Sequence, residues 1–355
     1  MTISRRALLG GAVMGDAIMG GAAPLLRIPN EAWALPSRLE VVGNGLQAGG
    51  RPIRLVGVAV GDPIYIRKGR PVSDYVAIAE DWLANSVRIS LHPGHWRADR
   101  EAATQALIRE VAAARALDLH VILCWHAIGF PDRYFEHPDP AWGLPLDAYE
   151  SDERLASDFW GQMTRLFGRD PGVLFELWNE PVVDGKLWRS TGQHWPLLKS
   201  LWLRLIAVIR KSSDNIILVA GGRWAHDLKG VARDPIEDSR TIYAWHSYPP
   251  ADRGQPGRWH DSLDGLSELK PVVVTEWGFC RNCGPHIRGT AEEFGIPFTR
   301  GVLDARGLHS TAWCWSPGAA PPMLEQDWAT PTEYGRFVKS YLKGARRTAD
   351  EARPR

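Results

Sequence analysis

Beyond residue 35, short apolar runs rich in β-forming residues alternate with longer stretches that have helical spacing. Strands that alternate with helices form parallel βαβ units, because each helix returns the chain to the same end of the sheet. The runs are nearly continuous in apolar residues, as strands buried on both faces require. There are eight of them: Ile53–Val60, Ser86–Leu91, Leu119–Trp125, Gly172–Trp178, Asn215–Ala220, Arg240–His246, Pro271–Trp277 and Ser310–Ser316. Eight such units close into a single α/β domain, a (β/α)₈ or TIM barrel.

The stretches between the runs predict the outer helices. Six have helical spacing: Arg100–Leu117, Ser151–Phe167, Trp195–Lys211, Trp259–Leu269, Ala291–Arg306 and Pro331–Lys343. The alternative, a doubly wound open sheet, would place a phosphate-binding glycine motif after its first strand. Gly57-Val58-Ala59-Val60-Gly61 is not such a motif. We therefore place one barrel domain in residues 35–345, a length that single α/β barrels commonly have.

Two short segments ahead of the first run, Leu39–Val42 and Arg51–Leu55, flank turns that contain glycine. This pattern predicts a β-hairpin at the floor of the barrel. The last ten residues, 346–355, are highly charged, and we expect them to form a frayed tail.

The first 34 residues have the features of a targeting segment rather than of a fold. Ser4-Arg5-Arg6 precedes a weakly apolar stretch rich in glycine and alanine, and Ala32-Trp33-Ala34 offers a small-x-small cleavage site. Asp16 interrupts the apolar stretch, which argues against a membrane span. The pattern resembles a twin-arginine export signal, so we expect a periplasmic or extracellular protein. The alternative is a disordered start or an uncleaved anchor.

The charge and the cysteine content of the chain limit the kinds of binding partner and metal site that it can be expected to have. The formal net charge is +1 and no block of like charge occurs, so nucleic acid and anionic membranes are poor candidates. Cys280 and Cys283 have the spacing of a zinc half-site, but a zinc ribbon needs a second such pair. The other two cysteines, Cys124 and Cys314, are far apart in the chain. We expect Cys280 and Cys283 to form a local disulfide or to remain a free pair. We expect no metal or organic cofactor, and we expect the protein to be a monomer.

Polar residues gather where the predicted strands end. Chemistry in this type of barrel occurs at the carboxyl ends of the strands. One ring of such ends carries two carboxylates together with aromatic and basic residues: Arg88, Trp125-His126, Asn179-Glu180, His246-Ser247-Tyr248, Thr275-Glu276-Trp277 and Trp313-Cys314-Trp315. The chain also has 17 tryptophans, whose flat amphipathic rings suit sugars, although we expect about two thirds of them in the core.

Two carboxylates across one barrel mouth indicate glycoside hydrolysis, in which one must be a proton donor and the other an ionised nucleophile. Arg88 and Tyr248 can both reach Glu276, and we expect them to keep its pKa low. Glu180, shielded by Trp178 and close to an ionised partner, is expected to have a raised pKa.

Other residues have predicted supporting or competing roles. Asn179 can donate to the sugar 2-hydroxyl, and Trp313 offers a floor for the ring. Trp315 would share the face of Trp313 by alternation and competes with it as the platform. Glu176, inside a strand, is interpreted as the buried partner of a basic residue.

These residues resemble glycoside hydrolase family five, a cellulase-like family of retaining β-glycosidases. The likeness follows the barrel in order through Ser86-Val87-Arg88-Ile89, Trp178-Asn179-Glu180-Pro181, His246-Ser247-Tyr248, Val274-Thr275-Glu276-Trp277-Gly278 and Ala312-Trp313-Cys314-Trp315. It implies Glu180 as the acid/base and Glu276 as the nucleophile. It implies supporting roles for Arg88, His126, Asn179, His246, Tyr248 and Trp313, and it favours Trp313 over Trp315 as the platform. It also implies retention of anomeric configuration and a cis peptide bond after Trp313.

The chain departs from the family pattern at one position. Many members have an acidic residue two positions before the third-strand histidine, and here Cys124 stands there. The partner of His126 is therefore open. His92 and His95 follow the second strand and either line a sugar subsite or are satisfied loop residues.

The stretch from Ala127 to Glu150 is a long loop in which Tyr134, Phe135 and Trp142 either contact sugar or pack on the surface. We expect a retaining endo-β-1,4-glucanase acting on β-glucan or a related polysaccharide. The same residues would also fit a β-mannanase, a β-1,3-glucanase, an exo-β-glucosidase or a transglycosylase. A non-catalytic sugar-binding barrel is the remaining alternative.

Overall fold

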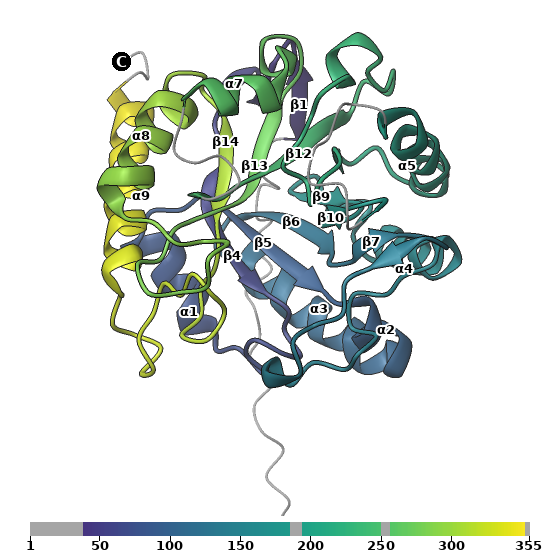
Figure 1. Cartoon of the computed structure of the whole chain (residues 1–355), viewed down its shortest axis with the longest axis horizontal. Helices are drawn as coiled ribbons and strands as arrows, with labels where there is room; N and C mark the ends of the chain where they lie inside the picture. The colour runs from purple at the N-terminus through teal and green to yellow at the C-terminus, as the bar shows by residue number, and fades with distance from the viewer. Residues whose placement is uncertain (1–37, 185–193, 250–255, 352–355) are drawn as a thin grey trace, which may run out of the picture. The chain divides into compact units, whose positions relative to one another are not determined.

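The computed structural model describes residues 38–184, 194–249 and 256–351, which form a closed barrel of parallel strands with helices around it (Figure 1). The hydrogen-bonded order is β11-β12-β13-β14-β4-β5-β6-β9. The barrel strands are β4 Val56–Gly61, β5 Ser86–Leu91, β6 His120–Trp125, β9 Val173–Glu176, β11 Ile217–Ala220, β12 Thr241–Ser247, β13 Val272–Trp277 and β14 His309–Ala312. Each lies in or overlaps one of the eight predicted runs, so the predicted (β/α)₈ barrel is confirmed.

The predicted helices are present, and short elements add to them. The helices are α1 Val72–Val76, α2 Pro93–Ala98, α3 Arg100–Arg115, α4 Glu153–Phe167, α5 Trp195–Arg210, α7 Pro256–Leu263, α8 Ile296–Phe298 and α9 Glu333–Glu351. Helices α1 and α2 were not predicted, because each is shorter than two turns. The last helix continues to Glu351, so the predicted frayed tail is wrong for residues 346–351. No described helix is both long and apolar enough to span a membrane.

The floor of the barrel is a three-stranded antiparallel sheet rather than the predicted hairpin. It consists of β1 Leu39–Val42, β2 Gly45–Ala48 and β3 Arg51–Ile53. Gly49 and Gly50 join β2 to β3, and both have positive φ, which a tight hairpin turn of this kind requires. The predicted run Ile53–Val60 is divided between β3 and β4. The predicted signal segment, residues 1–34, lies outside the described residues and stays a prediction.

Two apolar layers hold the barrel. A smaller cluster fills its interior and includes Leu46 of the floor together with Ile122, Leu174 and Val273. A larger cluster lies between the strands and the helices. Eleven of the described tryptophans are buried, so most of these rings belong to the core and few are left for sugar.

The four cysteines do not form a common metal site. Cys280 and Cys283 form a disulfide in the loop after β13, which confirms one of the two predicted alternatives. Cys124 and Cys314 are free and buried.

A buried neutral histidine, His309, lies where the last barrel strand pairs with the first. β14 pairs with β4, and just below this junction the backbone N–H of Leu55 donates to Nδ1 of His309 at 3.0 Å. His309 is 3% exposed. Burial, assisted by the charge of Arg54, lowers the pKa of His309 to about 3.

We expect His309 to make the stability of the fold dependent on pH. Its folded pKa lies below the unfolded value of about 6.5, so its contribution is complete above pH 6.5. Below that value the unfolded state binds a proton at this histidine and the folded state does not. The contribution of His309 to the free energy of unfolding then falls by about 1.4 kcal/mol per pH unit. An asparagine oxygen can accept the same bond without titrating. His309→Asn should therefore reduce the pH slope of the unfolding free energy between pH 6.5 and 4 by about that amount.

Urea denaturation at a series of pH values measures this slope. The exposed His137→Asn is the matched control. A His309→Asn slope equal to that of the unmodified protein would show that His309 is protonated in the folded state.

Candidate active site

The two predicted catalytic carboxylates stand at the carboxyl ends of β13 and β9. Glu276 belongs to β13 itself. Strand β9 ends at Glu176, and the chain continues through Asn179 into the short strand β10, Glu180–Pro181. Strand β10 pairs in parallel with β7, Ile128–Phe130, which holds Glu180 over the barrel mouth. The apolar run therefore ends in an amide and a carboxylate because the strand crosses there from the core into the site.

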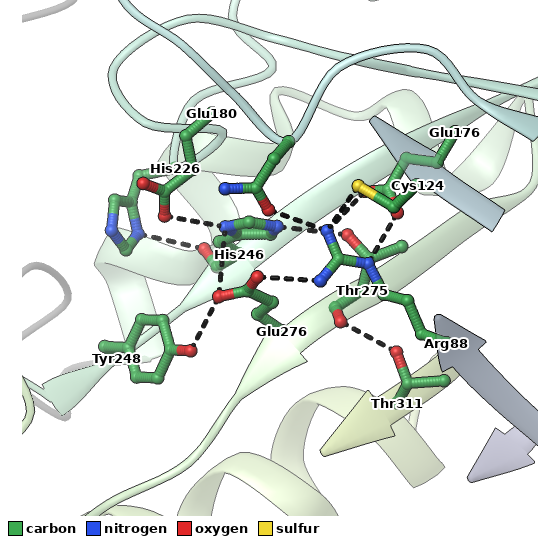
Figure 2. Close-up of polar contacts among 11 residues, drawn as sticks. Arg88, Cys124, Glu176, Glu180, His226, His246, Tyr248, Thr275, Glu276 and Thr311 are labelled. Atoms are coloured by element: carbon green, nitrogen blue, oxygen red, sulfur yellow. Dashed lines mark hydrogen bonds and ion pairs between the residues drawn. The ribbon is translucent and has the colours of Figure 1, made fainter. Parts of the chain in front are cut away.

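Glu180 and Glu276 meet around one imidazole (Figure 2). Nδ1 of His246 lies 3.1 Å from Oε1 of Glu180 and 3.8 Å from Oε2 of Glu276. One carboxylate oxygen of each glutamate lies within 4.8 Å of the other. The Glu180 side chain is 15% exposed and the Glu276 side chain 6%, so both retain contact with solvent. Carboxyl groups about 5–5.5 Å apart are typical of retaining glycosidases.

Arg88 of β5 is the cation of the site, and Figure 2 shows its guanidinium between Glu276 and Glu176. It donates from Nη1 to Oε1 of Glu276 at 2.7 Å and from Nε to Oε2 of Glu176 at 2.5 Å. Nη2 donates to Oδ1 of Asn179 at 2.7 Å. The predicted contact between Arg88 and Glu276 is present, and Glu176 is confirmed as the buried partner of a basic residue.

The departure at Cys124 is also explained by Arg88. Nη2 of Arg88 donates to Sγ of Cys124 at 3.1 Å, in addition to Oε1 of Glu176 at 3.2 Å. Burial raises the pKa of the Cys124 thiol well above its ordinary value, so this position is neutral. An acidic residue there would compete with Glu276 for the charge of Arg88.

The pKa of Glu276 differs from the prediction. Burial raises it, and the opposing effects of Arg88 and of the Tyr248 hydroxyl do not restore its ordinary value. Tyr248 donates to Oε2 of Glu276 at 2.9 Å, as predicted. The prediction of a low pKa was wrong because it counted the partners of Glu276 and not the loss of water around it.

The pKa of Glu180 is raised well above its ordinary value, as predicted, first by burial and then by the charge of Glu276. The predicted shielding by Trp178 is wrong. Trp178 packs outside the strands against Trp202 of α5, with ring centroids 6.2 Å apart. Arg88 and the Tyr248 hydroxyl donate to Glu276 and stabilise its carboxylate form, so Glu276 is the member of the pair that ionises and Glu180 the one that holds the proton.

His246 connects Glu180 to the barrel wall. Its Nε2 lies 3.1 Å from the Thr275 hydroxyl, and Thr311 donates to the carbonyl oxygen of Thr275 at 2.7 Å. Burial, with the nearby charge of Arg88, lowers the pKa of His246 well below its ordinary value. A neutral imidazole has one donor and one acceptor, so it can relay a hydrogen bond between Thr275 and Glu180.

A stacked pair of rings forms the wall beside the carboxylates. Trp313 and His126 are parallel to within 6°, with centroids 5.4 Å apart. Trp315 instead packs against Trp82 in the outer core at 4.7 Å, so the predicted preference for Trp313 is supported and the shared face is wrong. Strand β14 ends at Ala312, and alternation does not extend beyond it. The peptide bond after Trp313 is cis, as the resemblance implied.

The predicted contact of Asn179 with sugar stays a prediction. The side-chain oxygen of Asn179 accepts from Arg88, which leaves the amide N–H groups for another partner. In the long loop, Tyr134 and Phe135 form β8, which pairs with β7 next to Glu180. Trp142 is 52% exposed. The roles of these three loop residues as sugar contacts stay predictions.

The model of the cellulase family, glycosyl hydrolase family 5, matches residues 46–319. This chain belongs to glycosyl hydrolase family 5. The family 5 assignment covers every barrel strand, from β4 to β14.

Relatives of this family 5 protein include several bacterial endoglucanases. It is 29% identical to endoglucanase N of Pectobacterium atrosepticum over 284 residues, which are 75% of this chain and 56% of that protein. It is 26% identical to endoglucanase Z of Dickeya dadantii over 264 residues, 71% of this chain and 54% of that protein. The chain thus spans about half the length of the curated relatives it matches.

Solved structures agree with the fold. A β-glucanase of Saccharophagus degradans, crystallised with cellotetraose, superposes with a TM-score of 0.77 at 26% identity, over 87% of this chain and 94% of that one. The catalytic domain of the Thermobifida fusca endoglucanase Cel5A gives 0.69 at 21% identity, over 86% and 97%. The second likeness concerns the fold alone.

Sequence reasoning missed some residues around the family 5 site. His226 follows β11 and its Nδ1 lies 3.0 Å from the carbonyl oxygen of His246. Burial first, and then the charge of Arg223, lower the pKa of His226 to about 3. Asp62, at the end of β4, was also missed. Asp62 lies directly after a barrel strand and His226 lies in the loop that follows one, and these positions are the signal that could have found them.

Proposed function

We propose that this protein is a retaining glycoside hydrolase that cleaves internal β-1,4-glucosidic bonds by double displacement. The observation that supports it best is the pair of carboxylate oxygens of Glu180 and Glu276 within 4.8 Å of each other. Inverting enzymes keep their carboxyl groups about 6.5–9.5 Å apart to admit a water molecule. The endoglucanase relatives, and the β-glucanase crystallised with cellotetraose, support a β-glucan as the substrate.

In the first step, Glu276 attacks the anomeric carbon and Glu180 gives its proton to the leaving oxygen. A glycosyl ester with Glu276 forms as the glycosidic bond breaks. In the second step, Glu180 takes a proton from water, the water oxygen bonds to the anomeric carbon, and Glu276 leaves as a carboxylate. The proton transfers account for about 10²–10⁴ of the rate. Arg88 and Tyr248 stabilise the carboxylate form of Glu276 before attack and after release.

The substrate is tested by reducing-sugar release and product sizing on carboxymethylcellulose, mannan and laminarin. We expect the fastest release from carboxymethylcellulose, with short oligosaccharides as early products. Preference for mannan or laminarin would assign a β-mannanase or a β-1,3-glucanase. Release of glucose alone would indicate exo action, and longer products would indicate transglycosylation. Binding without turnover on all three would favour a sugar-binding barrel.

The hydroxyl of Tyr248 should set the acidic limb of the pH–rate profile. Glu276 must be ionised to attack, and the Tyr248 hydrogen bond is one of the contacts that lower its pKa. Tyr248→Phe removes that bond, so the pKa of Glu276 should rise. The acidic limb of kcat/KM then moves to higher pH, while the alkaline limb, set by Glu180, moves less.

An aryl β-cellobioside assayed over pH 4–9 measures both limbs. The control is Tyr341→Phe, which loses a hydroxyl bonded to Arg54 and Asp304 and not to the catalytic pair. An acidic limb that stays in place in Tyr248→Phe would show that this hydroxyl does not influence the nucleophile.

A further inference from the structure

Asp62 is a completely buried carboxylate that the catalytic steps above do not use. It follows β4 and accepts five hydrogen bonds. Its Oδ1 accepts from the backbone N–H groups of Ile64 at 2.7 Å and Tyr65 at 3.1 Å. Its Oδ2 accepts from the backbone N–H of His92 at 2.8 Å, from Nδ1 of His92 at 2.7 Å and from Nδ1 of His95 at 2.9 Å. Every contact of this carboxylate is with a donor.

These contacts determine the tautomers of the two imidazoles. Burial opposes the charge of Asp62, but the hydrogen bonds from His92 and His95 outweigh it, and its pKa lies well below the ordinary value. An ionised carboxylate can only accept, so both Nδ1 atoms must carry hydrogen. The remaining polar atom of each ring is Nε2. Among the described residues, neither Nε2 atom has a hydrogen-bond partner, and neither is a fully enclosed unpaired atom.

The two imidazoles extend the ring wall of the active site. The ring of His92 lies 4.8 Å from that of His126, which stacks on Trp313. On its other sides it lies 5.4 Å from His95 and 5.9 Å from Tyr65. Exposure increases away from His92 on both sides: the side chains of His92 and His95 are 5% and 15% exposed, and Tyr65 as a whole residue is 38% exposed. The row therefore leads from the catalytic pair toward solvent.

We propose that Asp62 is a positioning residue that fixes one tautomer of His92 and His95, so that their Nε2 atoms bind the hydroxyls of a sugar unit next to the one held at Glu276. This inference rests on the proposed function. In this tautomer Nε2 carries a lone pair and no hydrogen, so it can accept a hydrogen bond from a sugar hydroxyl. An array of fixed polar atoms beside aromatic rings matches the two kinds of surface on a pyranose.

A metal ion is the competing occupant, because the three ligand atoms lie close together. The geometry favours hydrogen bonds. The Oδ2 to Nδ1 separations of 2.7 and 2.9 Å are ordinary hydrogen-bond lengths. The same oxygen also accepts from a backbone N–H, which a bound cation would displace.

Asp62→Asn tests the role of the carboxylate. The amide replaces one acceptor by a donor, so it cannot accept all five hydrogen bonds. We measure kcat/KM on 2,4-dinitrophenyl β-glucoside, 2,4-dinitrophenyl β-cellobioside and cellotetraose. We expect the ratio of cellobioside or cellotetraose to glucoside to fall about tenfold, as expected from about 1–1.5 kcal/mol of lost hydrogen bonding. If the ratio falls for the dinitrophenyl cellobioside, the sugar bound by the two histidines lies on the glycone side. If it falls for cellotetraose alone, that sugar lies on the leaving-group side.

Three further measurements separate positioning from general damage. Imidazole ¹⁵N NMR should show the Nδ1–H tautomer for His92 and His95, and the signals of these two rings should change in Asp62→Asn. His95→Ala, at a partly exposed position, should reproduce the change in the ratio if the first variant does not fold. Asp170→Asn is the matched carboxylate control, because Asp170 accepts from Arg115 at the opposite end of the strands. It should leave the ratio unchanged.

Four outcomes would overturn the inference. An unchanged ratio in both Asp62→Asn and His95→Ala would do so, and so would equal losses on all three substrates. Unchanged imidazole signals in Asp62→Asn would show that Asp62 does not set the tautomers. Stoichiometric Zn²⁺ binding that is lost in Asp62→Asn would assign a metal site instead. If the unmodified protein cleaves no β-glycoside, the proposed function fails, and the NMR experiment still tests the tautomers.

Discussion

Glu276→Ala is expected to lower kcat on aryl β-cellobiosides by at least about 10⁴-fold, because no covalent intermediate can form without the carboxylate. Azide is a small anion that can occupy the space left by the side chain. Its addition should restore part of the activity and yield a glycosyl azide of inverted configuration. Proton NMR of the product gives its anomeric configuration.

The exposed Glu325→Ala, in the loop after β14, is the matched control and should retain full activity. Glu180→Ala should instead slow substrates with poor leaving groups by about 10²–10⁴-fold and affect dinitrophenyl glycosides less, because these need little protonation. An azide product of retained configuration from Glu276→Ala, or no loss of rate, would remove Glu276 from the role of nucleophile.

Arg88→Met should give the largest loss of stability of the substitutions considered. The Arg88 and Glu176 side chains are both 0% exposed, and the substitution leaves Glu176 buried without a cation. Breaking such a pair costs about 3–5 kcal/mol. Arg88→Lys keeps the charge but cannot present the same fork of donors to several partners, and we expect a smaller loss.

Urea denaturation at pH 7 measures both variants. Arg100→Met is the control, because Arg100 pairs with Asp158 where both side chains are about half exposed, and such pairs contribute roughly 0–1 kcal/mol. A loss of stability in Arg88→Met no greater than that in Arg100→Met would show that Glu176 does not depend on the guanidinium.

The barrel and the catalytic pair could be predicted because they depend on pattern. Strands buried on both faces must be continuous in apolar residues. Polar residues at the ends of such strands therefore stand out in the sequence, and closure of the barrel brings them together around its mouth. The floor was harder to predict, because the boundary between β3 and β4 falls inside one apolar run. The orientation of Trp178 was also hard to predict, since the chain leaves β9 two residues earlier, at Glu176, and strict alternation no longer applies.

The electrostatic details could not be predicted from residue types alone. The pKa of Glu276 depends on whether burial or its partners dominate, and the sequence names the partners without measuring the burial. Asp62 shows the same limit. Followed by Pro63, it has the local pattern of an ordinary turn, and its partners His92 and His95 are 30 or more positions away. Only the closed fold brings them to one oxygen.

The contacts of Arg88 have a consequence for any attempt to divide this enzyme. A single guanidinium on β5 is in contact with residues of β6, β9 and β13, which are contributed by both halves of the chain. A fragment ending before β11 would keep the proton donor and the cation but no nucleophile. The complementary fragment would keep the nucleophile without its counter-charge. Activity would therefore appear only when the two fragments reassemble, so this barrel could serve as a split enzyme that reports their association.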